Sequence, residues 1–224
     1  MNQVISDLFP SAIGVALSPV PIIAVILMLA TPKARSTGLA FAVGWITGLV
    51  VVGVVVLIAA GGSDQPDSAA STGASGLQLL FGLAFFALAA KQWRTRPKPG
   101  EPGEMPKWMA TIDTFAPGKC FVMGALLAGV NPKNLILTAA AATTIAQAGL
   151  DTTDSAIALG IFVLVASITV VGPVVFYLLA TEKAAAPLAS IKTFMSDNVA
   201  VISIVIFLVL GANLIGTGYA GLTA

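Results

Sequence analysis

The sequence predicts an all-α integral membrane protein whose six transmembrane helices form two inverted three-helix repeats, with helices one and four broken. Three observations support this fold class. Of the 224 residues, 57% are hydrophobic and only 9% are charged, whereas soluble domains carry roughly 25% charged residues. Long uncharged segments recur along the chain, and two of the apolar segments contain proline near the middle. The loops alternate between basic and acidic, so helix four starts on the opposite side of the membrane from helix one.

Five uncharged segments, and a sixth that contains a single lysine, are each longer than the roughly 18 residues that indicate a membrane-spanning helix. We predict the six spans at residues 5–30, 37–60, 75–92, 118–147, 156–180 and 198–219. The amino terminus carries Asp7 and Pro10 where a secretory signal would carry positive charge. We therefore expect the first span to remain in the mature protein.

The charges of the loops predict the orientation in the membrane. The loops after spans one and three carry Lys33, Arg35, Lys91, Arg94, Arg96, Lys98, Lys107 and Lys119. The charged residues in the loops after spans two and four are Asp64, Asp67, Asp151 and Asp154. The positive-inside rule then places the basic loops in the cytoplasm and both termini outside, and Lys183 and Lys192 after span five agree with this. A net charge of +1 gives no reason to expect a nucleic-acid partner.

We expect three parts along the chain, a first repeat, a cytoplasmic linker and a second repeat, covering residues 1–93, 94–117 and 118–224. The linker is too rich in proline and glycine to form a packed domain. After Pro106, the residues Trp108, Ile112 and Phe115 recur at helical spacing. This pattern predicts either a short helix in the cytoplasmic membrane interface or a plain linker with an aromatic anchor.

Two proline-containing breaks mark the candidate substrate site. Interrupted membrane helices leave backbone groups that protein or a watery cavity must satisfy, and in secondary transporters such breaks mark the substrate site. Two ordinary kinks are the alternative, because proline is common in membrane helices. We favour a shared site, with Ser18 and Asn131 approaching each other, because each break lies near mid-span of the first helix of its half. The candidate substrate-binding residues are Ser18, Pro19, Pro21, Asn131, Pro132, Lys133 and Asn134.

Lys133 is the only ionisable side chain predicted to lie in the interior of a span. Placing a lysine at the bilayer centre costs about 2.5–3.5 kcal/mol, so the residue needs a compensating role. It either faces the substrate or gates its path, or it caps carbonyl groups released by Pro132. The interiors of the spans contain no carboxylate and the chain contains no histidine, which argues against a proton relay. The cavity should therefore prefer an anionic group.

The remaining motifs favour packing over chemistry. Gly44 and Gly48 form a G-x-x-x-G motif, which we assign to internal helix packing before a dimer interface. Ser167, Thr169 and Asn213 could line the same cavity or hydrogen-bond between helices, and Gly172 with Pro173 could break span five as a hinge; we favour packing for each. The single cysteine excludes a dithiol carrier, and the missing histidine base argues against hydrolysis. We expect no enzymatic activity, no cofactor and no metal site.

The six-span length, the segment Ala16-Leu17-Ser18-Pro19-Val20-Pro21, the motif Asn131-Pro132-Lys133 and the basic central loop resemble the LysE-type exporter superfamily. Within it the chain is most similar to the GAP branch of peptidoglycolipid or sulfolipid addressing proteins. The resemblance implies a 3+3 inverted-repeat transporter, typically dimeric, that moves envelope glycolipids or their precursors outward across the bacterial inner membrane. Amino-acid exporters of the superfamily carry acidic residues near their broken helices, and this chain has none there, which weakens a basic amino acid as substrate.

The sequence thus predicts an exporter or flippase for an envelope glycolipid or a related anionic amphiphile. A small-solute exporter for amino acids or metal ions is one alternative, disfavoured by the missing carboxylates. The other is a non-transporting accessory protein that uses the basic loop to recruit enzymes of envelope-lipid synthesis. A homodimer is compatible with each of these functions.

Overall fold

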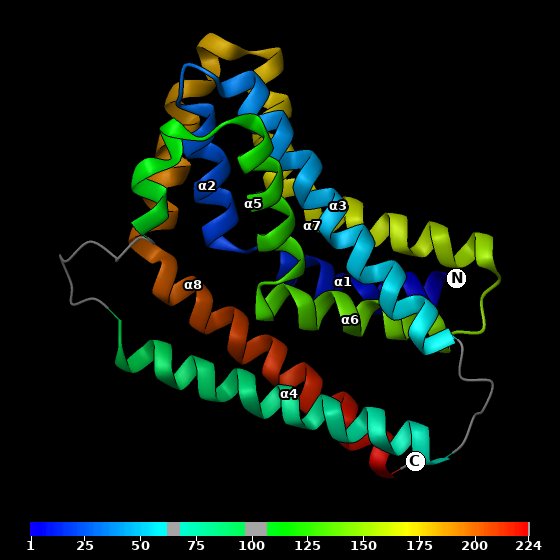
Figure 1. The fold of residues 1–224 in the computed structure, drawn as a ribbon. Helices are drawn as coiled ribbons and strands as arrows, with labels where there is room; N and C mark the ends of the chain where they lie inside the picture. The colour runs from blue at the N-terminus through cyan, green and yellow to red at the C-terminus, as the bar shows by residue number, and fades with distance from the viewer. Residues whose placement is uncertain (62–67, 97–106, 224) are drawn as a thin grey trace. The chain divides into compact units, whose positions relative to one another are not determined.

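The computed structural model describes residues 1–61, 68–96 and 107–223, which form helices joined by short turns (Figure 1). The helices are α1 (Asn2–Ala16), α2 (Pro19–Leu29), α3 (Ala34–Gly61), α4 (Ser68–Arg94), the 3-10 helix η1 (Lys107–Thr114), α5 (Pro117–Gly129), α6 (Pro132–Gln147), α7 (Thr152–Leu179) and α8 (Thr181–Thr223). The chain divides into two compact units, Met1–Gly61 with Glu104–Asp197, and Gly62–Gly103 with Asn198–Ala224.

Both predicted helix breaks are present in the first unit. The pair α1 and α2 is bent by 55°, and the pair α5 and α6 by 63°. The residue before each helix-starting proline has left the helical region, with ψ of 107° at Ser18 and 120° at Asn131. Proline sterically disfavours a helical conformation in the residue before it, so the sequence itself ends each preceding helix at this point.

The long helices of the first unit pack across the two halves of the chain. Helix α3 packs chiefly against α5, the first arm of the second broken pair, and α7 packs chiefly against α1, the first arm of the first broken pair. Each half of the chain therefore supplies one broken pair and one long helix, and that long helix packs against the broken pair of the other half. This reciprocal arrangement is the one expected of an inverted repeat.

Helix α2 is the most buried element of the first unit. Nine of its residues are buried, from Pro19 to Leu29, and the helix contacts α3, α7 and η1. A helix that is apolar on all sides is typical of a protein interior. Helix η1 contributes buried Met109 and Ile112, with Phe115 just after its end. Its predicted apolar side therefore packs on protein, against α2.

Small residues set the close approach of α3 and α5. A Cβ atom added at Gly48 would lie 2.9 Å from the Cβ of Ala128, and one added at Gly124 would lie 2.8 Å from the backbone nitrogen of Trp45. A Cβ at Gly44 would collide with the backbone of Phe121. The predicted G-x-x-x-G motif thus serves internal packing, and Gly124 with Ala128 forms the matching small-residue pair on α5.

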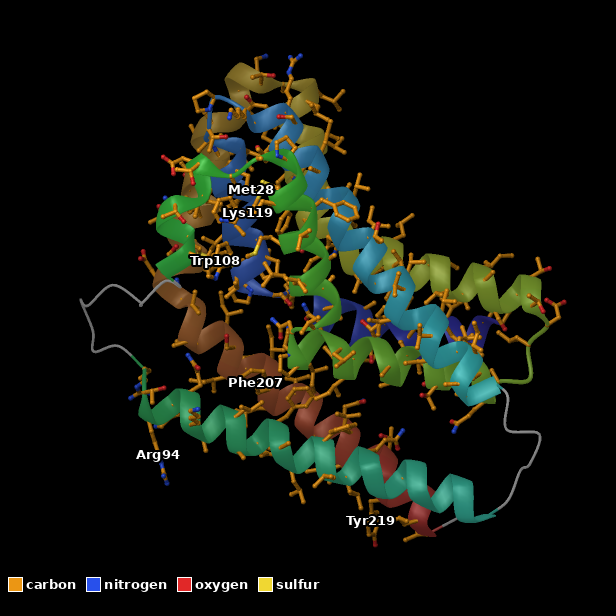
Figure 2. The ribbon with its side chains drawn as sticks, in the orientation of Figure 1. Met28, Arg94, Trp108, Lys119, Phe207 and Tyr219 are labelled. Atoms are coloured by element: carbon orange, nitrogen blue, oxygen red, sulfur yellow. The ribbon has the colours of Figure 1, made fainter. Side chains whose placement is uncertain are left out.

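The second unit consists of α4 and the part of α8 that follows Asp197. The rings of Phe85 and Phe207 stack with centroids 5.7 Å apart, and Figure 2 labels Phe207 on α8. A Cβ added at Gly211 would lie 3.1 Å from the carbonyl oxygen of Gly82. Glycine on both helices therefore lets the two backbones approach closely.

Three described helices are long and apolar enough to span a membrane, with candidate spans at Ala34–Ala60, Thr152–Leu179 and Lys183–Thr223, and the two bent pairs raise the number to as many as five. The three single helices coincide with predicted spans two, five and six, and the two bent pairs coincide with predicted spans one and four. The predicted third span, residues 75–92, falls within α4, and its crossing of the membrane stays a prediction, as do the orientation of the termini and the repeat boundaries. Residues 181–197 are helical, so the loop expected between spans five and six is instead the start of α8.

Candidate functional site

Buried side chains join the two helix breaks directly. The Ser18 hydroxyl lies 2.9 Å from Oδ1 of Asn134, while Nδ2 of Asn134 donates to the carbonyl oxygen of Leu127 at 2.9 Å. Ser18 is 2% exposed and Asn134 is 0% exposed. Because Ser18 precedes α2 and Asn134 lies in the first turn of α6, this contact holds together the two points where the helices are interrupted.

The carbonyl groups at the end of α1 receive hydrogen bonds from three different elements. The last four carbonyls of a helix lack partners within it, and in a membrane each unsatisfied group is costly. Nζ of Lys133 donates to Gly14 at 2.6 Å, Oγ of Ser18 lies 2.7 Å from the carbonyl oxygen of Val15, and Oγ1 of Thr169 donates to Ala16 at 2.5 Å. Helices α6 and α7 thus complete the end of α1.

The Ser18 hydroxyl has a choice between two acceptors. It has one proton, and both the carbonyl oxygen of Val15 and Oδ1 of Asn134 are within hydrogen-bond distance. The proton can be given to only one of them at a time. Ser18 is therefore a point where hydrogen bonding can switch between the end of α1 and the start of α6.

Proline limits the number of unsatisfied donors at the starts of α2 and α6. A proline in the first turn has no N–H group, so no donor there is left without a partner. Pro19 and Pro21 act in this way in α2, and Pro132 does so in α6. Asn131 caps α6, because its Oδ1 accepts from the backbone nitrogen of Lys133 at 3.2 Å. The breaks thus keep few free donors.

The Lys133 ammonium keeps spare hydrogen-bonding capacity. It carries three protons. Among the described residues, its hydrogen-bond acceptor is the carbonyl oxygen of Gly14, and the side chain is half-buried. The capping role considered for this lysine is therefore real, but the carbonyl belongs to α1 and not to the helix that precedes Pro132. Two protons remain for another group.

The predicted residues fall into three roles. Ser18, Lys133 and Asn134 form the polar contact between the two halves, Asn131 makes its hydrogen bond within its own half, and the three prolines begin the second arms. Ser18 and Asn131 are the residues expected to approach each other, and the hydrogen bond between the two breaks is made by Asn134, three residues after Asn131. The assignment of substrate binding to these residues stays a prediction.

Two polar residues extend the site beyond those predicted. Thr169, assigned to packing from the sequence, caps Ala16 and so brings α7 to the break. Thr138 is fully buried one helical turn beyond Asn134, and its hydroxyl has no hydrogen-bond partner among the described residues. The spacing of Asn134 and Thr138 places both on one helix face, which is the signal that could have identified Thr138. Among the described residues of the chain, no group of three or more His, Cys, Asp or Glu side chains could hold a metal ion.

Comparison with protein-family models gives one assignment for nearly the whole chain. Residues 8–220 match the model described as Sap, sulfolipid-1-addressing protein. No curated protein and no solved structure was found to be similar to the chain. The matched range includes both helix breaks and helices α3, α4 and α7, and it ends within the last turn of α8.

Proposed function

The chain belongs to the sulfolipid-1-addressing protein family of the LysE/GAP branch, and on this premise we propose that it exports or flips an anionic envelope lipid through the site at its two helix breaks. The family assignment makes it a membrane protein and implies a role in the transport or export of envelope lipids. The finer proposal names the site and the class of substrate. We place this activity in the bacterial inner membrane, with a lipid as the partner.

The observation that carries the proposal is the position of the Lys133 ammonium. It reaches from the second break to Gly14 at the end of α1, at 2.6 Å, and retains two protons for a ligand. A sulfate or carboxylate oxygen would accept charge-assisted hydrogen bonds from these protons, which are roughly twice as strong as those between neutral groups. The sequence segments that form the two breaks, residues 14–21 and 127–138, contain no acidic residue, and the acceptor of Lys133 among the described residues is a backbone carbonyl.

The backbone at the breaks supports recognition of an anion by Lys133 in particular. The N-termini of α2 and α6 point their positive dipole ends toward the interruptions, as discontinuous helices do toward anionic substrates in transporters. However, proline removes N–H donors from both first turns. The N-termini of α2 and α6 then supply a positive electrostatic potential that favours an anion, while Lys133 supplies the directional hydrogen bonds.

We test this with Lys133→Met and with Lys119→Met as the matched control. Lys119 lies at the start of α5, exposed, with its ammonium 3.7 Å from the Phe115 ring centre (Figure 2). Hydrogen bonds to charged groups contribute about 1.5–3 kcal/mol, so loss of the Lys133 ammonium should lower export roughly 10- to 150-fold. Lys119→Met should leave export near the wild-type rate.

The measurement is the fraction of the anionic envelope lipid that reaches the outer surface, in cells producing each variant at matched levels of membrane-inserted protein. Lys133→Arg keeps the charge and should retain more export than Lys133→Met. Full export by Lys133→Met would exclude charge recognition by this residue. Equal loss in Lys133→Met and Lys119→Met would assign the effect to general cationic charge and not to the site.

A further inference from the structure

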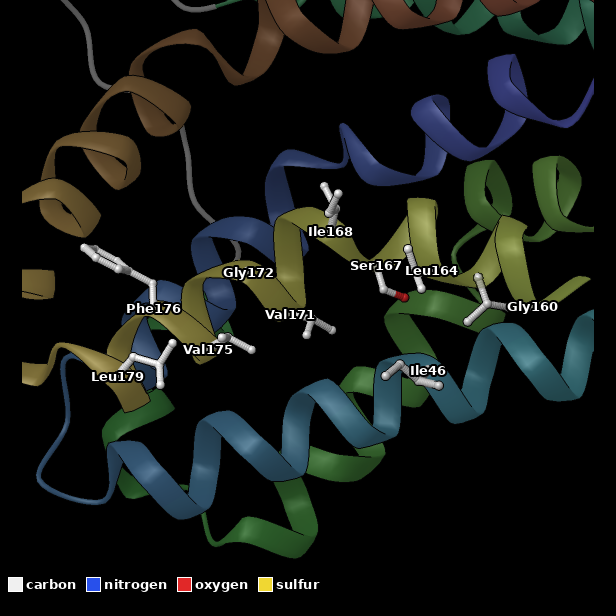
Figure 3. A pocket seen from close by; sticks show the side chains of 11 residues that line it. Ile46, Gly160, Leu164, Ser167, Ile168, Val171, Gly172, Val175, Phe176 and Leu179 are labelled. Atoms are coloured by element: carbon white, nitrogen blue, oxygen red, sulfur yellow. The ribbon is translucent and has the colours of Figure 1, made fainter. Parts of the chain in front are cut away.

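A long apolar groove follows one face of α7 in the first unit. It extends from Gly160 to Leu179, and Ile46 of α3 lines its opposite side. The lining positions on α7 recur every three or four residues, which is the spacing of a single helix face. In Figure 3, Ser167 and Val171 point toward α3, and Ile46 points back toward them. Among the described residues that line the groove, none carries a charge, and Ser167 alone carries a hydroxyl.

The dimensions of the groove fit a hydrocarbon chain. Gly160 and Leu179 are nineteen residues apart on a continuous helix, which corresponds to about 28 Å. A volume of about 700 Å³ over that length gives a mean cross-section of about 25 Å². An extended hydrocarbon chain is about 4–5 Å thick, judged from carbon contact distances, whereas an α-helix with side chains measures about 10–12 Å. The space is therefore wide enough for one acyl chain and too narrow for a helix of a second copy.

Two glycines keep the groove open. In the described part of the chain, no atom lies within 4 Å of the position that a Cβ would occupy at Gly160 or at Gly172, apart from the neighbouring backbone. Larger side chains at these positions would occupy the groove itself. The exposed side chains of Leu164 and Ile168 flank it and extend its apolar wall.

Ser167 gives the groove one polar point, at the depth of the helix break. The residue is 4% exposed, and its hydroxyl has no hydrogen-bond partner among the described residues. A buried hydroxyl without a partner is uncommon and indicates an absent ligand or water. Thr169, two residues further along α7, donates to Ala16 at the end of α1. Ser167 and Thr169 point about 200° apart around α7, so the groove and the break lie at a similar depth but on opposite faces of the helix.

We propose that the part of the groove between Ser167 and Leu179 holds one hydrocarbon chain of the transported amphiphile, with the ester or amide linkage of that chain at Ser167 and the anionic head extending around α7 to Lys133. This inference rests on the proposed function, since it concerns the same substrate. It assigns recognition of the tail to α7 and recognition of the head to α6. The protein then holds both ends of the lipid during transfer and does not leave the tail wholly in the bilayer.

Photolabelling of the purified full-length protein in phosphatidylcholine nanodiscs tests the assignment. The tail probe is a sulfated galactosylceramide with a diazirine at the end of its acyl chain, and the head probe carries the diazirine on the sugar. A phosphatidylcholine with a diazirine at the end of one acyl chain reports ordinary surrounding lipid. We expect the tail probe to label residues 167–179 and the head probe to label residues near Lys133.

Gly172→Leu should block the groove, and Ala156→Leu adds the same side chain at an exposed position of α7 outside it. Overpacking costs about 1–3 kcal/mol, so Gly172→Leu should lower tail labelling of α7 roughly 5- to 150-fold. Head labelling should persist, and Ala156→Leu should change neither. If Gly172→Leu does not fold, the wild-type labelling pattern decides the assignment without it.

Several results would overturn the inference. These are tail labels spread evenly over lipid-facing helices, equal labelling of residues 167–179 by the phosphatidylcholine probe, and covalent dimers linked through α7. Head labelling at the break with no tail labelling on α7 would refute the groove and keep the proposed function. Tail labelling on α7 with no head labelling near Lys133 would instead refute the proposed head site.

Discussion

The hydrogen bond between Ser18 and Asn134 should couple the two helix breaks energetically. Hydrogen bonds between helices in membrane proteins contribute about 0.6 kcal/mol on average and up to about 1.7 kcal/mol. Both side chains here are almost fully buried, at 2% and 0% exposure, so neither is compensated by water in the variant proteins. We therefore expect a coupling energy of about 1 kcal/mol between the two positions.

The single variants should differ because Asn134 makes two hydrogen bonds. Asn134→Ala also leaves the carbonyl oxygen of Leu127 without its side-chain donor and creates a cavity, so it should destabilise by about 2–3 kcal/mol. Ser18→Ala removes one hydroxyl and should cost about 1 kcal/mol. The double variant should then be destabilised by about 1 kcal/mol less than the sum of the two single effects.

The assay is the free energy of unfolding in detergent micelles for the wild type, both single variants and the double variant. The control cycle replaces Asn134→Ala by Thr144→Ala. Thr144 donates to Ala140 of its own helix and lies ten residues, about 15 Å, further along α6. Its effect should add to that of Ser18→Ala within about 0.3–0.5 kcal/mol. A coupling below about 0.3 kcal/mol for Ser18 and Asn134 would refute the link between the breaks.

Two further predictions concern packing and orientation. Gly124→Leu should destabilise the first unit by about 1–3 kcal/mol, because a Cβ there already lies 2.8 Å from the backbone nitrogen of Trp45. An unchanged melting temperature would argue against the close contact between α3 and α5. A cysteine at Thr152 should react with a membrane-impermeant thiol reagent in intact cells, and one at Gly100 should not, because the basic loops are expected inside. Labelling at Gly100 would reverse the orientation.

The helix breaks could be predicted from sequence because their cause is local. Pro19 and Pro132 remove a backbone donor and exclude the helical conformation from the preceding residue, whatever the tertiary structure. The structure has breaks at both positions. The packing of Gly44 and Gly48 was predictable for a similar reason, since two glycines one turn apart leave a flat helix surface.

The partners at the breaks could not be predicted in the same way. Ser18 and Asn134 are 116 residues apart, and their contact depends on how α1, α5 and α6 pack. From sequence alone, Asn131 and Asn134 are equally good candidates for the hydrogen-bond partner of Ser18. The structure distinguishes them, because Asn131 accepts a hydrogen bond as the cap of α6 while Asn134 faces the other half.

The error over residues 181–197 has a different origin. Lys183, Lys192 and Asp197 indicate contact with water, and this charge predicted a loop for their segment. Charge reports the environment of a side chain but does not determine the conformation of the backbone. The segment is rich in alanine, the residue with the highest helix propensity, and α8 begins there. Pro187 is accommodated within that helix.

Lys133 shows that a structural and a recognition role need not exclude each other. Its bond to Gly14 satisfies a carbonyl that the break has freed, and this bond also fixes the ammonium between the two halves with two protons available. Lys133→Met would therefore remove a ligand for the head and leave the Gly14 carbonyl without that donor, at a cost of about 1–3 kcal/mol. If lysine served the fold alone, export per folded molecule would stay at the wild-type level while stability fell. If it also recognises the lipid, export per folded molecule falls as well, so measuring both quantities on one variant separates the two contributions.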